Sequence, residues 1–380
     1  MSPHRHHHRF NRTAVVSASA GVAAIASVYV YFVIFAEFAF IEHARETINN
    51  FNLTALLIAL GLGGIGGSLH ASRRFRPENG ARQLSVGFAA CAVAAGVSLV
   101  ARNSPLAMIA AALISFSLAW TTVTLSLCLR PTLHLKKLGT WCGLGTGIAY
   151  AFCNQPPVFT ASPTAQTVIA LLAALVGWFA SLHFTSASSK PSTSLDYRPF
   201  ISSLWVVLFL ALVWLDSGAF SIIQHNPVLH AGTWDGALTL QGNAFVHLCT
   251  AVITGLALDR RLLPLALGAA LLALMGACLF LGGSARYFPA AQVFYTAGVS
   301  LYTTALICFA ARSGRPQLIG ILFAVSCWFG SFVGTSMAQL NDPMPLSFIL
   351  TIAVVATAAF VIRHLLLRRI RAEQGAISLP

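Results

Sequence analysis

The sequence predicts an all-helical integral membrane protein with twelve transmembrane helices in two bundles of six, and with both chain ends in the cytoplasm. Three observations predict this fold class: the composition, the recurrence of long apolar segments and the distribution of basic residues. Of the 380 residues, 57% are hydrophobic and only 9% are charged, whereas roughly 25% are charged in an ordinary soluble domain. A soluble fold could not cover its surface with so few charges.

Apolar segments of about 20 residues recur along the whole chain, which is the helix length that crosses a bilayer. We expect helices at 14–41, 52–70, 84–101, 105–128, 139–159, 165–185, 200–223, 237–258, 262–282, 288–310, 317–339 and 345–366. The longest polar interruption between them is Ser186–Pro199, rich in Ser and Pro. It divides the chain into a basic tail (1–12), a first bundle (13–186), a linker (187–199) and a second bundle that ends in a basic tail (200–380). Such halves are expected of transporters built from repeats.

The basic residues fix the expected orientation. With the N-terminus in the cytoplasm, 20 of the 23 Lys and Arg residues fall on the cytoplasmic side, and only Arg45, Arg102 and Arg286 fall outside. This is the positive-inside distribution. The net charge of +13 therefore faces anionic lipid and does not indicate a nucleic-acid partner. We expect a cell-membrane location, in a bacterial inner membrane, and a monomer.

A short motif at the cytoplasmic end of the eighth helix carries a family resemblance. Gly255-x-x-x-Asp259-Arg260-Arg261 resembles the cytoplasmic loop signature of the major facilitator superfamily, in its second-half copy. The first-half copy, with Gly67, Arg73 and Arg74, has Ala71 where the family usually has aspartate. The resemblance implies that these residues help to lock the cytoplasmic gate and that the fold is a two-bundle transporter.

The fifth helix carries Gly139, Gly143 and Gly147 at four-residue spacing. Small residues at this spacing let two helices approach closely. Some antiporters of the family have a similar stripe followed by Gly-Pro, but Ile148 follows Gly147 here. We therefore interpret the stripe as a packing surface.

Two acidic residues lie inside apolar helices. Asp216 is in the seventh and Glu37 in the first, and these helices are equivalent under a two-half repeat. Because a charge at the bilayer centre costs at least ~2.5 kcal/mol, such residues usually face a polar cavity. Loss of hydration favours the protonated form of a carboxyl group, so both are candidates for proton coupling. A neutral, hydrogen-bonded structural acid is the alternative.

His247 is the one histidine expected near mid-membrane, and Asn243 lies one turn earlier on the same face. His247 is a third candidate for proton coupling, with a hydrogen-bonded packing role as the alternative. Further candidates for the lining of a solute-binding cavity are Asn243, Asn154, Gln155, Gln292, Tyr295 and Tyr302.

The expected function is a secondary transporter, coupled to protons, that moves a small neutral, cationic or amphipathic solute without a cofactor. No Lys or Arg lies deep in an expected helix, which disfavours anionic solutes. One alternative is a copper importer that captures metal through His225 and His230, although only Met108, Met275 and Met337 among the five methionines are in helices. Another is a membrane assembly or sensor protein. The sequence contains no H-E-x-x-H or G-x-S-x-G motif, so we expect no enzyme.

Overall fold

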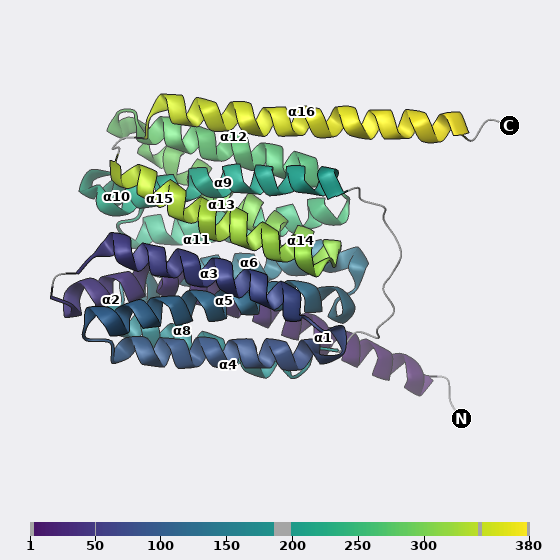
Figure 1. Cartoon of the computed structure of the whole chain (residues 1–380), viewed down its shortest axis with the longest axis horizontal. Coiled ribbons are helices and arrows are strands. Elements are labelled where there is room, and N and C mark those ends of the chain that lie inside the picture. Colours follow the sequence, from purple (N-terminus) through teal and green to yellow (C-terminus); the bar gives the residue numbers. More distant parts are fainter. Residues whose placement is uncertain (1–3, 50, 186–198, 341–343, 378–380) are drawn as a thin grey trace.

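The helices of this protein lie side by side along one axis in the computed structural model, which describes residues 4–49, 51–185, 199–340 and 344–377 (Figure 1). Eleven helices within these ranges are long and apolar enough to cross a membrane, and no strand occurs in them. The all-helical prediction is thereby confirmed for the part of the chain that the structure describes.

The first half of the chain contains six long helical segments. The first is one continuous helix made of α1 (His4–Val30), the π-helical segment η1 (Tyr31–Ala39) and α2 (Phe40–Thr47). The others are α3 (Leu53–Arg74), α4 (Gly80–Leu99), α5 (Ser104–Thr132), α6 (Leu138–Cys153) with the short α7 (Pro156–Phe159), and α8 (Pro163–Ser181). Short 3₁₀ turns at Pro77–Asn79 (η2) and Leu135–Lys137 (η3) precede α4 and α6.

The second half repeats this plan. Its long segments are α9 (Pro199–His225), α11 (Ala237–Asp259), α12 (Leu263–Leu281), α13 (Phe288–Ser313) and α16 (Leu346–Ile377). One more is continuous through α14 (Pro316–Ile321), the π-helical η5 (Leu322–Phe329) and α15 (Gly330–Leu340). The short α10 (Pro227–Thr233) and the 3₁₀ turn η4 (Ala285–Tyr287) lie between long helices.

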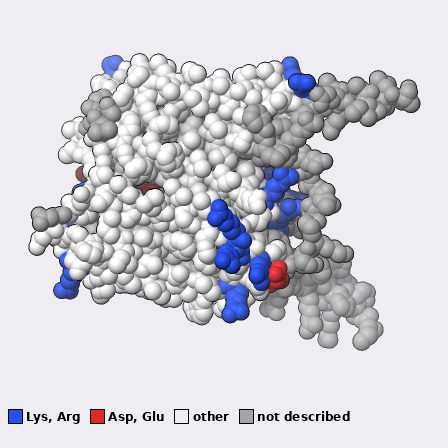
Figure 2. All heavy atoms as spheres, viewed as in Figure 1, with Lys and Arg blue, Asp and Glu red and all other residues white. Residues whose placement is uncertain are grey.

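The two ends of the bundle differ. The tail end, from which α1 and α16 extend (Figure 1), carries the connections after Arg74, Thr132, Asp259 and Ser313. The far end carries those after Thr47, Leu99, Cys153, His225 and Leu281. Most of the Lys and Arg side chains visible in Figure 2 lie toward the tail end, beside a broad surface without charge.

Helices of the first half pack mainly on one another, as do those of the second half, and Figure 1 shows them on opposite sides of the bundle. The halves meet along two seams. In the first seam, α6 packs on α11; in the second, α3 packs on α14 and η5. Between the seams, α13 contacts both α5 and α6.

The bounds of two expected helices are wrong. The first helix continues to Thr47, so Glu42, Arg45 and Glu46 lie in a helical turn where we expected a loop, and α1 already begins at His4 within the expected tail. The span expected at 139–159 is interrupted, because Pro156 and Pro157 follow Gln155, whose backbone is extended. α6 alone has 16 residues, about 24 Å, and is not among the eleven. The expected linker lies outside the described residues except for Pro199.

Candidate functional site

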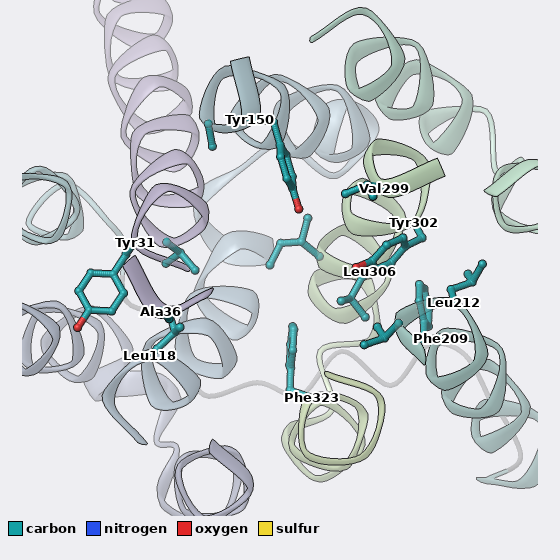
Figure 3. Close-up of a cluster of buried hydrophobic side chains, with 14 of the residues drawn as sticks. Tyr31, Ala36, Leu118, Tyr150, Phe209, Leu212, Val299, Tyr302, Leu306 and Phe323 are labelled. Carbon is teal, nitrogen blue, oxygen red and sulfur yellow. The ribbon is translucent and has the colours of Figure 1, made fainter. Parts of the chain in front are cut away.

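A cavity of about 170 Å³ lies between the two halves. Its walls come from α1, η1, α2, α3 and α5 of the first half and from α9, α13, η5 and α15 of the second. It reaches toward the far end, because Gln224 and His225 at the end of α9 and Leu53 at the start of α3 belong to its lining. Figure 3 shows Tyr150 and Tyr302 directing their hydroxyl groups toward the centre of the bundle, with Leu118 and Phe323 around it.

Asp216 lines this cavity and is held by two tyrosines. The Tyr295 hydroxyl donates to its Oδ1 over 2.8 Å, and the Tyr302 hydroxyl donates to its Oδ2. The two tyrosines are seven residues apart on α13, two helical turns, and so share a face. Three residues that the sequence analysis selected separately therefore form one cluster.

Glu37 also lines the cavity and has different surroundings. It lies in the π-helical segment Tyr31–Ala39 and is partly buried. No hydrogen bond or ion pair joins its carboxylate to any described residue. π-Helical turns are rare and frequently mark functional sites. The second such segment, Leu322–Phe329, provides Cys327 and Trp328 to the same cavity.

No Lys or Arg is among the residues that line the cavity, whereas two carboxyl groups are. Aromatic side chains form much of the remaining wall; they are Tyr29, Phe32, Phe220, Tyr302, Phe323, Trp328 and Phe332. The described residues thus give the cavity acidic and aromatic character.

His247 is buried and is not part of the cavity lining. Its Nδ1 lies 2.7 Å from the Ser300 hydroxyl. Its ring stacks on Tyr150 of α6, with centroids 4.5 Å apart. Since Tyr150 and His247 come from different halves, this stack is part of the α6–α11 seam.

Asn243 belongs to a buried polar network near the far end. Its Oδ1 accepts hydrogen bonds from Gln292 Nε2 at 2.9 Å and from the Thr296 hydroxyl at 3.1 Å, and its Nδ2 donates to the Thr233 carbonyl at 3.3 Å. Asn154 and Gln155, by contrast, donate to backbone carbonyls of α6. The structure does not bring these two amides to the cavity.

The tail end of the α6–α11 seam is held by Asp259. Its carboxylate accepts from the backbone N–H groups of Gly139 (2.7 Å) and Thr140 (2.9 Å) and from the Thr140 hydroxyl (2.6 Å). These are N–H groups of the first turn of α6, which have no partner within the helix. The Arg312 guanidinium of α13 completes the site, 3.0 Å from Asp259 Oδ1. Asp259 therefore caps a helix of the other half.

The arginines of the motif do not take part in this contact. Arg260 and Arg261 are exposed, and their guanidinium groups make no hydrogen bond to the described residues. The positive charge at Asp259 comes from Arg312 instead. Arg73 and Arg74 are likewise exposed. Gly67 packs against the Phe116 backbone of α5, within its own half. The sequence does not single out Arg312, because an arginine at the end of an apolar helix has the pattern of an ordinary membrane anchor.

The glycine stripe of α6 packs as expected. A Cβ atom at Gly143 would overlap the Ala251 carbonyl oxygen, and one at Gly139 would overlap that of Gly255. Only glycine allows this approach of the two backbones.

The histidines considered for metal capture lie apart from other ligands. His225 Nδ1 is 2.8 Å from the Ser221 carbonyl oxygen, and His230 makes an edge contact with Trp234. The described residues contain no group of three His, Cys, Asp or Glu side chains that could hold a metal ion.

Solved structures with the same arrangement of helices are transporters of the major facilitator superfamily. The human organic anion transporter MFSD10 (TETRAN) superimposes with a TM-score of 0.60 at 15% identity, over 93% of this chain and 99% of that chain. The major facilitator transporter FucP, in the outward conformation, gives 0.65 at 12% identity, with the same coverage. The sequence matches no protein family model and no curated protein.

The chain is therefore a multi-pass membrane protein with the major facilitator fold. The resemblance that the Gly255 motif carries is confirmed for the fold.

Proposed function

We propose that this protein is a secondary active transporter that moves a small neutral, cationic or amphipathic solute by alternating access, coupled to protons. We further propose that two six-helix bundles, 13–186 and 200–380, are joined by the linker 187–199. The chain then crosses the membrane twelve times, and α6 with its flanking turns forms the twelfth crossing. The tail end faces the cytoplasm, where its basic residues meet anionic lipid.

The observation that carries proton coupling is the hydrogen bonding of Asp216. A carboxylate accepts from both Tyr295 and Tyr302, whereas a protonated carboxyl must itself donate one hydrogen bond. Protonation thus changes the contact between α9 and α13. Because α13 also touches α5 and α6 of the other half, one proton can alter how the halves meet.

The described conformation supports alternating access. The halves are joined at the tail end through Asp259, while the cavity reaches toward the far end. With the tail end in the cytoplasm this is an outward-facing arrangement, the state in which FucP was solved. Transport requires the Asp259 contacts to break.

The cavity favours a neutral or cationic solute. Its two carboxyl groups are not balanced by any Lys or Arg in the lining, and an anion without a compensating charge is costly to bury. The substrate class named for MFSD10 is accordingly not the one we propose here. His247 and Asn243 do not line the cavity, and we propose that they adjust its shape through their contacts with α6 and α13.

The test is solute-dependent proton movement. Purified protein in liposomes that contain a pH-sensitive dye is exposed to a solute library, with wild type, Asp216→Asn and Asp235→Asn side by side. Asp235 is an exposed acid outside the cavity, so its variant is the control for the same chemical change. We expect wild type and Asp235→Asn to move protons when a solute is added, and Asp216→Asn to lose at least about tenfold in rate, ~1.4 kcal/mol. Equal rates in all three proteins would remove Asp216 from the mechanism.

A further inference from the structure

The two acids of the cavity are not equivalent, although both line the same space. Asp216 already accepts two hydroxyl hydrogen bonds. Glu37 has no partner among the described residues and is partly buried. A carboxylate in such a position loses hydration without compensation. A bound positive charge would therefore stabilise Glu37 more than Asp216.

The walls around Glu37 supply the second part of a binding site. Phe32 lies on the same helix, and Phe220, Trp328 and Phe332 line the cavity from the second half. Aromatic faces attract organic cations and also bury apolar surface. Because the lining includes no Lys or Arg, no resident side chain of that kind competes for Glu37.

We infer that Glu37 binds the positive group of an organic monocation, and that the aromatic walls hold the apolar body of this solute. Asp216 then remains available to the proton. This inference rests on the proposed transport function and names its substrate class. The Glu37 carboxylate is free, whereas the Asp216 carboxylate is occupied by two tyrosines. The cavity therefore favours a solute with one positive charge over a solute with two.

The test uses four probes of similar size with different head groups: 2-phenylethylamine, benzyltrimethylammonium, 2-phenylethanol and phenylacetate. Apparent affinity is obtained from thermal stabilisation of the purified protein at increasing probe concentration. We expect both cations to stabilise wild type at concentrations at least about tenfold lower than the neutral or anionic probe, ~1.4 kcal/mol. The fixed charge of benzyltrimethylammonium ensures that ligand protonation does not produce this order.

Glu37→Gln is expected to lose at least about tenfold in affinity for both cations while its affinity for 2-phenylethanol stays unchanged. Glu42→Gln is the matched control, because Glu42 pairs with Arg45 outside the cavity, and it is expected to bind as wild type does. Glu37→Asp keeps the charge and should keep the preference for cations, which serves as the test if Glu37→Gln does not fold.

The outcomes separate this inference from the transport proposal. Equal binding of charged and neutral probes, or unchanged cation binding in Glu37→Gln, overturns the role of Glu37 even if solutes drive proton movement. Cation binding that depends on Glu37, without proton movement in liposomes, supports the site and overturns proton coupling. Asp216→Asn is expected to keep cation binding and to lose proton movement.

Discussion

The two seams between the halves are built from different chemistry. In the α6–α11 seam, backbones touch at Gly139, Gly143 and Gly255, and the Asp259 carboxylate joins them through charge-assisted hydrogen bonds. In the second seam, Gly320 of α14 packs against Ser72 and Gly64 of α3 packs against the ring of Trp328. These contacts of the second seam carry no charge, and one of them is made by a side chain that lines the cavity.

The difference continues toward the far end. The α6–α11 seam passes through the Tyr150–His247 stack to an aromatic cluster in which Trp234 meets Phe38, Phe159 and Phe220. The second seam instead has the cavity along its far-end part, between residues such as Leu57 of α3 and Phe332 of α15. The first seam is therefore closed along its length, and the second is the side from which a solute can influence the contact between halves.

The largest effect is expected from Gly255→Ala. The new Cβ would overlap the Gly139 carbonyl oxygen and lie 2.9 Å from the Gly139 carbonyl carbon, and a backbone cannot move aside as a side chain does. Overpacking typically costs about 1–3 kcal/mol. We expect the tail end to open and the buried thiol of Cys142 on α6 to react with N-ethylmaleimide at least about tenfold faster, ~1.4 kcal/mol, as measured by peptide mass spectrometry.

Gly242→Ala is the control for this substitution. Gly242 lies on the same helix, and its added Cβ would meet no atom within 4 Å. The rate of Cys142 labelling should equal that of wild type. If both variants label Cys142 equally, the close approach of the backbones is not what keeps the tail end closed.

A smaller effect is expected from Asp259→Asn. The amide keeps one acceptor oxygen but loses the charge that favours the first turn of α6 and the Arg312 guanidinium. Because Arg312 is 30% exposed and Asp259 13%, solvent screens the pair, and we expect a loss of about 1–2 kcal/mol. A double-mutant cycle with Arg312→Gln, read from thermal unfolding, should give a coupling energy of about 0.5–1 kcal/mol. Additive single effects would show that Asp259 acts through α6 alone.

Much of this architecture could be predicted from the sequence, because length and hydropathy determine which segments cross a membrane. The glycine stripe at Gly139, Gly143 and Gly147 was predictable as a packing surface for the same reason, since its spacing is a local property. Pro156 and Pro157 indicate a break after α6, although the helix expected at 139–159 runs through them. The motif at Gly255 includes Asp259, whereas Arg312, which meets the Asp259 carboxylate, lies outside the motif.

The candidate site was less predictable, because it depends on distances between helices. The sequence selected Asp216, Tyr295 and Tyr302 separately, and only the fold brings both tyrosines to one carboxylate. Nor does any local pattern reveal the π-helical segments that place Glu37 and Trp328 at the cavity. Asn154 and Gln155 show the converse, since polar residues in an apolar helix can be satisfied by their own backbone.

The smallest effect on stability is expected from Gly64→Ala in the second seam, and it sharpens the contrast between seams. The added Cβ would overlap the Trp328 ring, but this side chain borders the cavity and can turn into it. Alanine is also favoured over glycine in a helix by roughly 1 kcal/mol, which offsets part of the strain. We expect a change in unfolding free energy within about 1 kcal/mol, together with a several-fold loss of affinity for benzyltrimethylammonium because the displaced ring occupies part of the cavity.

Gly61→Ala is the control, because its Cβ would lie 3.9 Å from Phe332 Cβ. It should lower neither the unfolding free energy nor the affinity for benzyltrimethylammonium. Equal loss of stability in Gly64→Ala and Gly255→Ala would mean that the two seams are equally rigid. The Trp328 ring would then not turn into the cavity to make room for the added methyl group.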